Sequence, residues 1–155
     1  WVSSIFTGSQ EIRELCESRG WHLTLDLSHA ALACAVDGVD LAGFLRELRP
    51  WVEHYHISDA YGVDGEGMQI GEGEISWPAV WPHLWDGYGG TWVPEIWRGH
   101  LGDGDGFRTA LARLAALGRK MAPEPGTGTG MARAPEMARE PGPENKEADP
   151  CRSKS

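Results

Sequence analysis

The last quarter of the sequence lacks the branched aliphatic and aromatic residues that build protein cores. Residues 119–155 contain no Val, Ile, Leu, Phe, Trp or Tyr, but they hold six of the ten prolines. Such a segment cannot bury enough apolar surface to offset the entropy lost when its backbone is ordered. We therefore expect a disordered tail over residues 119–155 and a folded domain over residues 1–118, which contains all eight tryptophans.

Positive charge is scarce in the expected domain. Residues 1–118 carry seven Lys or Arg against seventeen Asp or Glu, a formal charge of −10. Proteins that bind DNA or RNA gain most of their affinity by neutralising phosphates. We therefore do not expect a nucleic acid among the partners.

Cysteines and long apolar runs are also few. Cys16, Cys34 and Cys151 are an odd number without a CxxC pair, so no disulfide framework is expected and a reducing cytoplasm is the expected location. No apolar run approaches the roughly 18 residues that cross a bilayer, and no secretory signal is visible, so we expect no membrane partner. Because the numbering opens on Trp1, in what reads as the middle of an element, we expect a missing N-terminal portion.

Two kinds of apolar pattern alternate along the domain. Three short segments are rich in strand formers: 21–27, 51–58 and 91–97. Helical spacing of apolar residues indicates four helices. The first follows Ser9, which is expected to cap it, and the second begins at Asp40. The third follows Ser76, and the fourth begins at Phe107. Gly118 is expected to end the last of them.

Strands that are separated by helices imply parallel pairing through helical crossovers, so the fold class is α/β. Each repeat takes about 35 residues, and a closed eight-fold barrel takes about 250. We therefore predict a partial (half) TIM barrel of parallel strands with flanking helices. An open doubly wound sheet is the structural alternative, but the polar residues at the strand ends favour the barrel.

Asp26, His56 and Glu95 each lie near the C-terminal end of a different predicted strand, where barrel enzymes place catalytic groups. Each also has a structural interpretation: Asp26 caps the next helix, His56 lies in the core, and Glu95 is a paired carboxylate within a buried strand. Together they supply the O and N ligands that suit Mn²⁺, Mg²⁺ or Zn²⁺. His29, three residues after Asp26, is placed to point into the same pocket.

The segment from Tyr61 to Gly73 is rich in glycine and acidic residues. It has no lysine and no helix start directly after it, which argues against a phosphate-binding loop. Two interpretations stay open: a wall of the active site, or a flexible surface loop.

Four motifs in order carry a resemblance to a family. They are Asp26-Leu27-Ser28-His29-Ala30, His56-Ile57-Ser58-Asp59, Ile70-Gly71-Glu72-Gly73-Glu74-Ile75 and Pro94-Glu95-Ile96-Trp97. This series resembles the C-terminal half of xylose-isomerase-like TIM barrels, over about residues 1–118. That superfamily includes sugar isomerases, sugar-phosphate epimerases and the endonuclease IV group of apurinic-site nucleases. The stretches around 56–74 and 94–100 most resemble epimerase-like domains that are sometimes attached to sialic-acid-type synthases.

The resemblance implies roles for four residues. Asp26 and His56 would be metal ligands, His29 would bind substrate, and Glu95 would be both a ligand and one of two acid/base carboxylates. The implied activity is a divalent-metal-dependent isomerase or epimerase that moves a proton on a sugar or sugar phosphate through an enediolate.

Three positions depart from the family pattern. The other acid/base Glu of the family belongs to a strand upstream of Trp1. The endonuclease branch has an Asp-x-His before the motif at Ile70, where this chain has Gly65-Glu66-Gly67. Some epimerases carry an Arg a few residues after the metal His, where Tyr61-Gly62 stands here.

Three hypotheses about function therefore stay open. The chain is a sugar isomerase or epimerase that supplies one half of the site, or a non-catalytic truncated barrel or binding module, or an apurinic-site endonuclease. An incomplete barrel leaves sheet edges unpaired, so we expect self-association or a partner that supplies the missing half.

Overall fold

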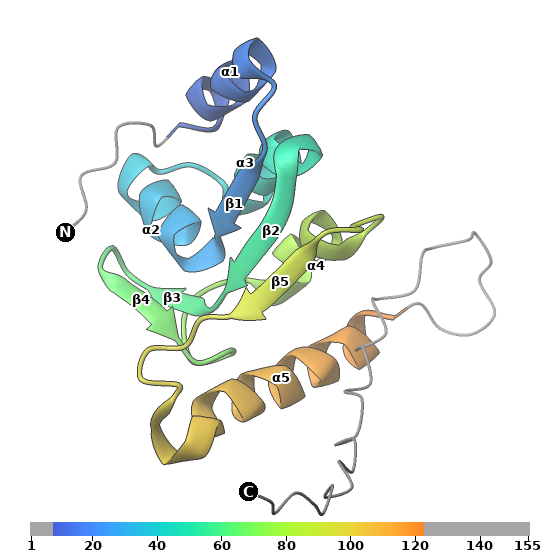
Figure 1. The fold of residues 1–155 in the computed structure, drawn as a ribbon. Helices are drawn as coiled ribbons and strands as arrows, with labels where there is room; N and C mark the ends of the chain where they lie inside the picture. Colours follow the sequence, from blue (N-terminus) through green and yellow to red (C-terminus); the bar gives the residue numbers. More distant parts are fainter. Residues whose placement is uncertain (1–7, 123–155) are drawn as a thin grey trace, which may run out of the picture.

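The computed structural model describes residues 8–122. Of the predicted tail, residues 119–155, the part from position 123 onward lies outside the described residues, and so does Cys151. The helices are α1 (Ser9–Arg19), α2 (Leu27–Asp37), α3 (Leu41–Leu48), the short 3₁₀ helix η1 (Arg49–Trp51), α4 (Trp77–Trp85) and α5 (Leu101–Met121). The strands are β1 (Leu23–Asp26), β2 (Val52–Ile57), β3 (Asp59–Tyr61), β4 (Gly65–Met68) and β5 (Thr91–Pro94). Figure 1 shows their arrangement in space.

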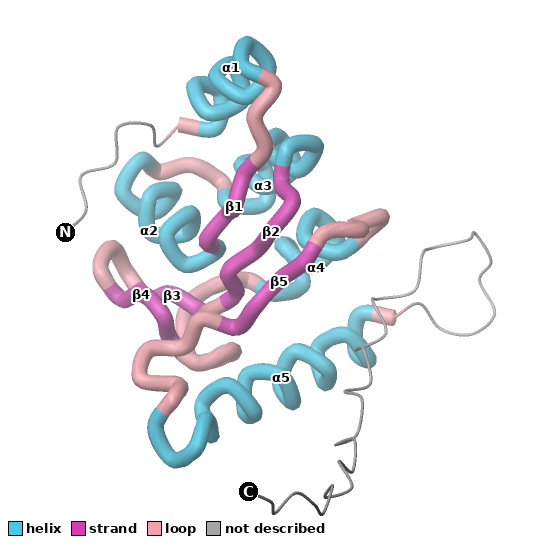
Figure 2. Tube along the Cα trace, in the orientation of Figure 1, coloured by secondary structure: helices cyan, strands magenta, loops and turns pink. Residues whose placement is uncertain are grey.

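Strands β1, β2 and β5 form a parallel sheet in that order. The connection from β1 to β2 contains α2 and α3, and the connection from β2 to β5 contains the β3–β4 hairpin and α4 (Figure 2). The α/β prediction is confirmed. The three strands run in the same direction, so their carboxyl ends lie at one edge of the sheet.

One face of this sheet forms the core. Leu25, Tyr55 and Ile57 are buried, together with Leu45 of α3 and Leu84 of α4. Full burial of a Leu or Ile side chain stabilises the fold by about 1.5–3 kcal/mol. Because side chains alternate along a strand, the residues between these buried ones are presented on the opposite face, which is polar and partly exposed.

The start of α1 differs from the expectation. Gly8 occupies the cap position without a side-chain bond, and Ser9 instead donates its hydroxyl to Oε2 of Glu47 on α3 at 2.6 Å. Arg13 donates to the other oxygen of Glu47 at 3.0 Å. The prediction of Ser9 as a helix cap is therefore wrong, because its hydroxyl has a partner on another helix. Hydrogen bonds from Ser9 and Arg13 lower the pKa of Glu47.

Helix α5 also differs from its expected bounds. It begins at Leu101, has left-handed residues at 102–104, and continues through Gly118 to Met121. A side chain at Gly118 would come within 3.2 Å of the Trp81 ring, so this glycine provides space for a tryptophan of α4. The prediction that Gly118 ends the helix is wrong, and the expected domain boundary at residue 118 falls inside α5.

Cys16 and Cys34 are buried free thiols, as expected from the cysteine pattern. Burial raises the pKa of Cys34 to about 11, so this thiol stays protonated at neutral pH. None of the helices between residues 8 and 122 combines the length and apolarity needed to cross a membrane.

Candidate metal centre

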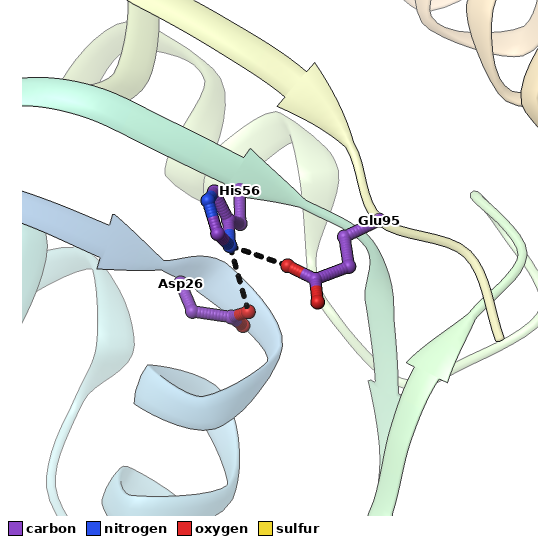
Figure 3. Close-up of side chains that lie close together, drawn as sticks. All are labelled: Asp26, His56 and Glu95. Atoms are coloured by element: carbon purple, nitrogen blue, oxygen red, sulfur yellow. Dashed lines mark ion pairs between the residues drawn. The ribbon is translucent and has the colours of Figure 1, made fainter.

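Asp26, His56 and Glu95 meet at the carboxyl edge of the sheet (Figure 3). Asp26 is the last residue of β1 and lies directly opposite His56 in the register of β1 and β2. His56 lies opposite Val93 of β5, and Glu95 follows Val93 by two positions. Since side chains two positions apart project from the same face of a strand, the topology brings the three polar groups together.

The three groups are close enough to share one ion. Nδ1 of His56 lies 3.8 Å from Oδ2 of Asp26 and contacts Oε2 of Glu95. One ligand atom from each residue lies within 4.8 Å of the others. Metal–ligand bonds of about 2.0–2.2 Å place neighbouring ligand atoms roughly 3–4 Å apart. The donor set is therefore compact enough for one divalent ion.

The two carboxylate oxygens of Asp26 have different roles: one caps a helix and the other faces the cluster. Its Oδ1 accepts hydrogen bonds from the Ser28 hydroxyl and the His29 backbone N–H, both at 2.9 Å, which caps α2. Its Oδ2 faces His56. The capping interpretation is therefore confirmed, and it is compatible with a ligand role because the two oxygens have different neighbours.

His56 is not enclosed in the core. Its side chain is 35% exposed on the polar face of the sheet. The ring of His54 lies edge-on to it with the centroids 5.3 Å apart, and Nδ1 of His54 lies 2.7 Å from the Thr91 hydroxyl. This packing fixes one side of the His56 ring and leaves Nδ1 facing the two carboxylates.

Glu95 is more exposed than expected. Strand β5 ends at Pro94, and the Glu95 side chain is 56% exposed, so the prediction of a carboxylate inside a buried strand is wrong. Its backbone N–H nevertheless donates to the carbonyl of Ile57 at 3.0 Å, which adds one bond to the β2–β5 pairing. Glu95 is therefore held in line with β2 while its carboxylate stays accessible.

A cleft with a volume of about 470 Å³ opens beside this cluster, lined by Asp26, His29, Ser58, Glu66, Glu95 and Arg98 among others. The hydrogen-bond partner of the His29 ring is not one of the three clustered residues. Its Nε2 lies 2.7 Å from the Glu66 carboxylate, across the cleft from α2. The sequence placed His29 in a common pocket with Asp26, and the structure does the same.

The glycine-rich segment forms one wall of the cleft. It folds into the β3–β4 hairpin, and Glu66 and Gly67 of β4 line the cleft. Buried Asp59 holds the following loop: its Oδ1 accepts from the N–H groups of Ala60 and Ile75, and its Oδ2 accepts from the N–H of Gly71 and Nε1 of Trp77. Of the two interpretations for this segment, the geometry favours the wall.

Ser58, Glu66 and Arg98 are among the cleft-lining residues to which the sequence analysis assigns no role. Ser58 lies in the motif from His56 to Asp59, Glu66 lies in the glycine-rich segment, and Arg98 follows Glu95 by three positions. Their common signal is proximity to a strand end, where a polar residue on the loop is placed near the site.

Comparison with known proteins supports the fold. No family model and no curated protein matches the chain. A solved structure described as a D-tagatose 3-epimerase-like protein is similar, with a TM-score of 0.54 and 21% sequence identity. The match covers 79% of this chain and 46% of that structure, so this chain spans less than half the length of its neighbour. The likeness supports the predicted fold, a partial TIM barrel of parallel strands with flanking helices.

Proposed function

We propose that this chain supplies one half of the active site of a divalent-metal-dependent sugar or sugar-phosphate isomerase or epimerase. The observation that carries the proposal is the convergence of Asp26, His56 and Glu95 at the carboxyl edge of a parallel sheet. The epimerase-like neighbour supports this reading through its fold.

The donor set suits Mn²⁺, Mg²⁺ or Zn²⁺, because two carboxylates and one imidazole are ligands for all three. Asp26, His56 and Glu95 would hold the ion, and its affinity should be modest with three ligands from this chain. When bound, such an ion polarises the carbonyl and hydroxyl oxygens of an open-chain sugar and so makes the neighbouring C–H more acidic.

Glu95 is the residue of this site best placed to move a proton. One of its oxygens contacts His56, and its exposure leaves the carboxylate accessible from the cleft. As a base, Glu95 removes the proton from the carbon beside the carbonyl to give an enediolate. Return of that proton to the adjacent carbon, together with transfer of the hydroxyl proton from one oxygen of the enediolate to the other, gives isomerisation. Inversion of a carbon needs a second acid on the opposite face.

His29 has a binding role in this proposal. Its ring lines the cleft and is oriented by Glu66, so a sugar oxygen that lies between His29 and Glu95 would be close to both. An imidazole N–H donates a hydrogen bond to an oxygen within reach. His29 would then hold the substrate oxygen while Glu95 acts on the carbon.

Proton exchange with solvent tests the proposal directly, because one carboxylate is enough to remove and return a proton. The full chain is incubated with Mg²⁺ and D-fructose or D-fructose 6-phosphate in deuterium oxide, and NMR follows deuterium uptake beside the carbonyl. We expect uptake by the unmodified chain, loss of uptake in Glu95→Gln, and normal uptake in Glu53→Gln, a control on the exposed start of β2. Metal binding without any uptake would contradict the enzyme and favour a non-catalytic binding module.

A further inference from the structure

Arg98 is the only Lys or Arg that lines the cleft beside Asp26 and Glu95 within the described chain. The acidic groups of this cleft already have partners: Glu66 pairs with His29, and Asp26 and Glu95 both face His56. No side-chain hydrogen bond or ion pair between residues 8 and 122 includes Arg98. In the same part of the chain, Arg13, Arg108 and Arg113 each pair with a carboxylate.

The backbone holds Arg98 in an unusual conformation. Its φ of 56° lies in the left-handed region, which costs a residue with a β-carbon about 1–2 kcal/mol. Neighbouring bonds impose this turn: the N–H of Trp97 donates to Gly67 at 2.7 Å, and the N–H of Leu101 donates to the Arg98 carbonyl at 3.0 Å. Residues under such strain are concentrated at ligand-binding and catalytic sites.

Ser58 provides an independent observation in the same cleft. This residue is buried, and its Oγ lacks a hydrogen-bond partner within residues 8–122. An unpaired buried hydroxyl costs about 1–3 kcal/mol, so a partner from a ligand would recover that loss. Arg98 and Ser58 are thus two donors in one cleft without an acceptor from the described chain.

We propose that Arg98 selects an anionic sugar as substrate by binding its phosphate ester or carboxylate, with Ser58 donating to another oxygen of the same molecule. This inference rests on the proposed function, because it assigns the remote end of the substrate whose reacting end lies at Glu95. The guanidinium binds phosphate or carboxylate through two parallel hydrogen bonds. A local cation is also needed, since a domain with a formal charge of −10 repels an anionic ligand.

Calorimetry on the Mn²⁺-loaded full chain tests the inference with three probes: D-fructose, D-fructose 6-phosphate and D-glucuronate. We expect at least one anionic sugar to bind about tenfold more tightly than D-fructose, which corresponds to one charge-assisted contact. In Arg98→Met this preference should fall to within about twofold, while the affinities for Mn²⁺ and D-fructose stay unchanged. Arg19→Met, on α1 and away from the cleft, is the charge-matched control.

Two outcomes separate this inference from the proposed function. Equal affinity for D-fructose and both anionic sugars, or an equal loss for all three in Arg98→Met, would overturn the role of Arg98 and leave the sugar site standing. Failure of the full chain to bind Mn²⁺, or to bind any of the three sugars, would overturn the proposed function and this inference together.

Discussion

Asp26 and His56 lie directly opposite each other across two parallel strands, with Oδ2 of Asp26 3.8 Å from Nδ1 of His56. The backbone pairing of β1 and β2 sets this relationship, so two of the three candidate ligands are held by the sheet itself. A site built on strands keeps its geometry more precisely than a site built on loops. The third ligand, Glu95, extends the same pairing by one hydrogen bond to Ile57.

Substitution of Asp59 should destabilise the wall of the cleft. Asp59 is fully buried and its two oxygens accept four hydrogen bonds, so Asp59→Asn replaces one accepting oxygen with a donor. We expect the free energy of unfolding to fall by about 3 kcal/mol, because buried donors that face Asp59 lose a charged acceptor. Urea unfolding measures it, with Asp64→Asn on the exposed hairpin as the control. Equal midpoints for the two variants would contradict the structural role of Asp59.

Alanine substitutions at Gly67 and Gly71 distinguish the cost of backbone strain from the cost of a steric contact. Both have positive φ values, 64° and 80°, but a β-carbon at Gly67 would lie 3.2 Å from the Trp97 nitrogen, whereas nothing lies within 4 Å at Gly71. Gly71→Ala should cost about 1 kcal/mol from the backbone alone. Gly67→Ala should lower the stability further and weaken the binding of anionic sugars, because Trp97 and Arg98 would shift. A smaller loss of stability in Gly67→Ala than in Gly71→Ala would contradict this.

Glu47 makes the attachment of α1 to α3 sensitive to pH. Its pKa is lowered by hydrogen bonds from Ser9 and Arg13, so its stabilising effect is present above the unfolded-state value of about 4.3 and is lost as the pH falls through the folded value. The melting temperature of the unmodified chain should therefore fall more steeply below about pH 4.5 than that of Glu47→Gln. If the melting temperatures of the two proteins fell equally steeply with pH across this range, Glu47 would not link the helices.

The sequence located the three candidate ligands because strand ends can be recognised in a sequence. Asp26 and His56 lie at the ends of short runs of strand formers. Parallel strands bring their carboxyl ends to one edge of the sheet irrespective of the loop conformations. The bounds of the strands are predicted less accurately: the sequence pattern places Glu95 inside a strand, but β5 ends at Pro94 and leaves the carboxylate exposed.

Features that depend on contacts distant in sequence could not be predicted. Ser9 resembles a helix cap, but its hydroxyl donates to Glu47, which is 38 positions away. Gly118 resembles a helix end, but it accommodates the Trp81 ring. The sequence does not indicate the β3–β4 hairpin, because its glycines have low strand propensity. The loop after the hairpin is held by hydrogen bonds to Asp59.

Binding of Mn²⁺ to the full chain tests the central claim, that Asp26, His56 and Glu95 form a metal centre, most directly. The electron paramagnetic resonance signal of free Mn²⁺ measures how much ion the protein removes from solution. We expect about one bound ion per chain, an affinity at least tenfold lower in His56→Ala, and an unchanged affinity in His22→Ala, which removes an exposed histidine paired with Glu53. Binding of the same strength in His56→Ala, or no binding by the folded unmodified chain, would contradict the metal centre.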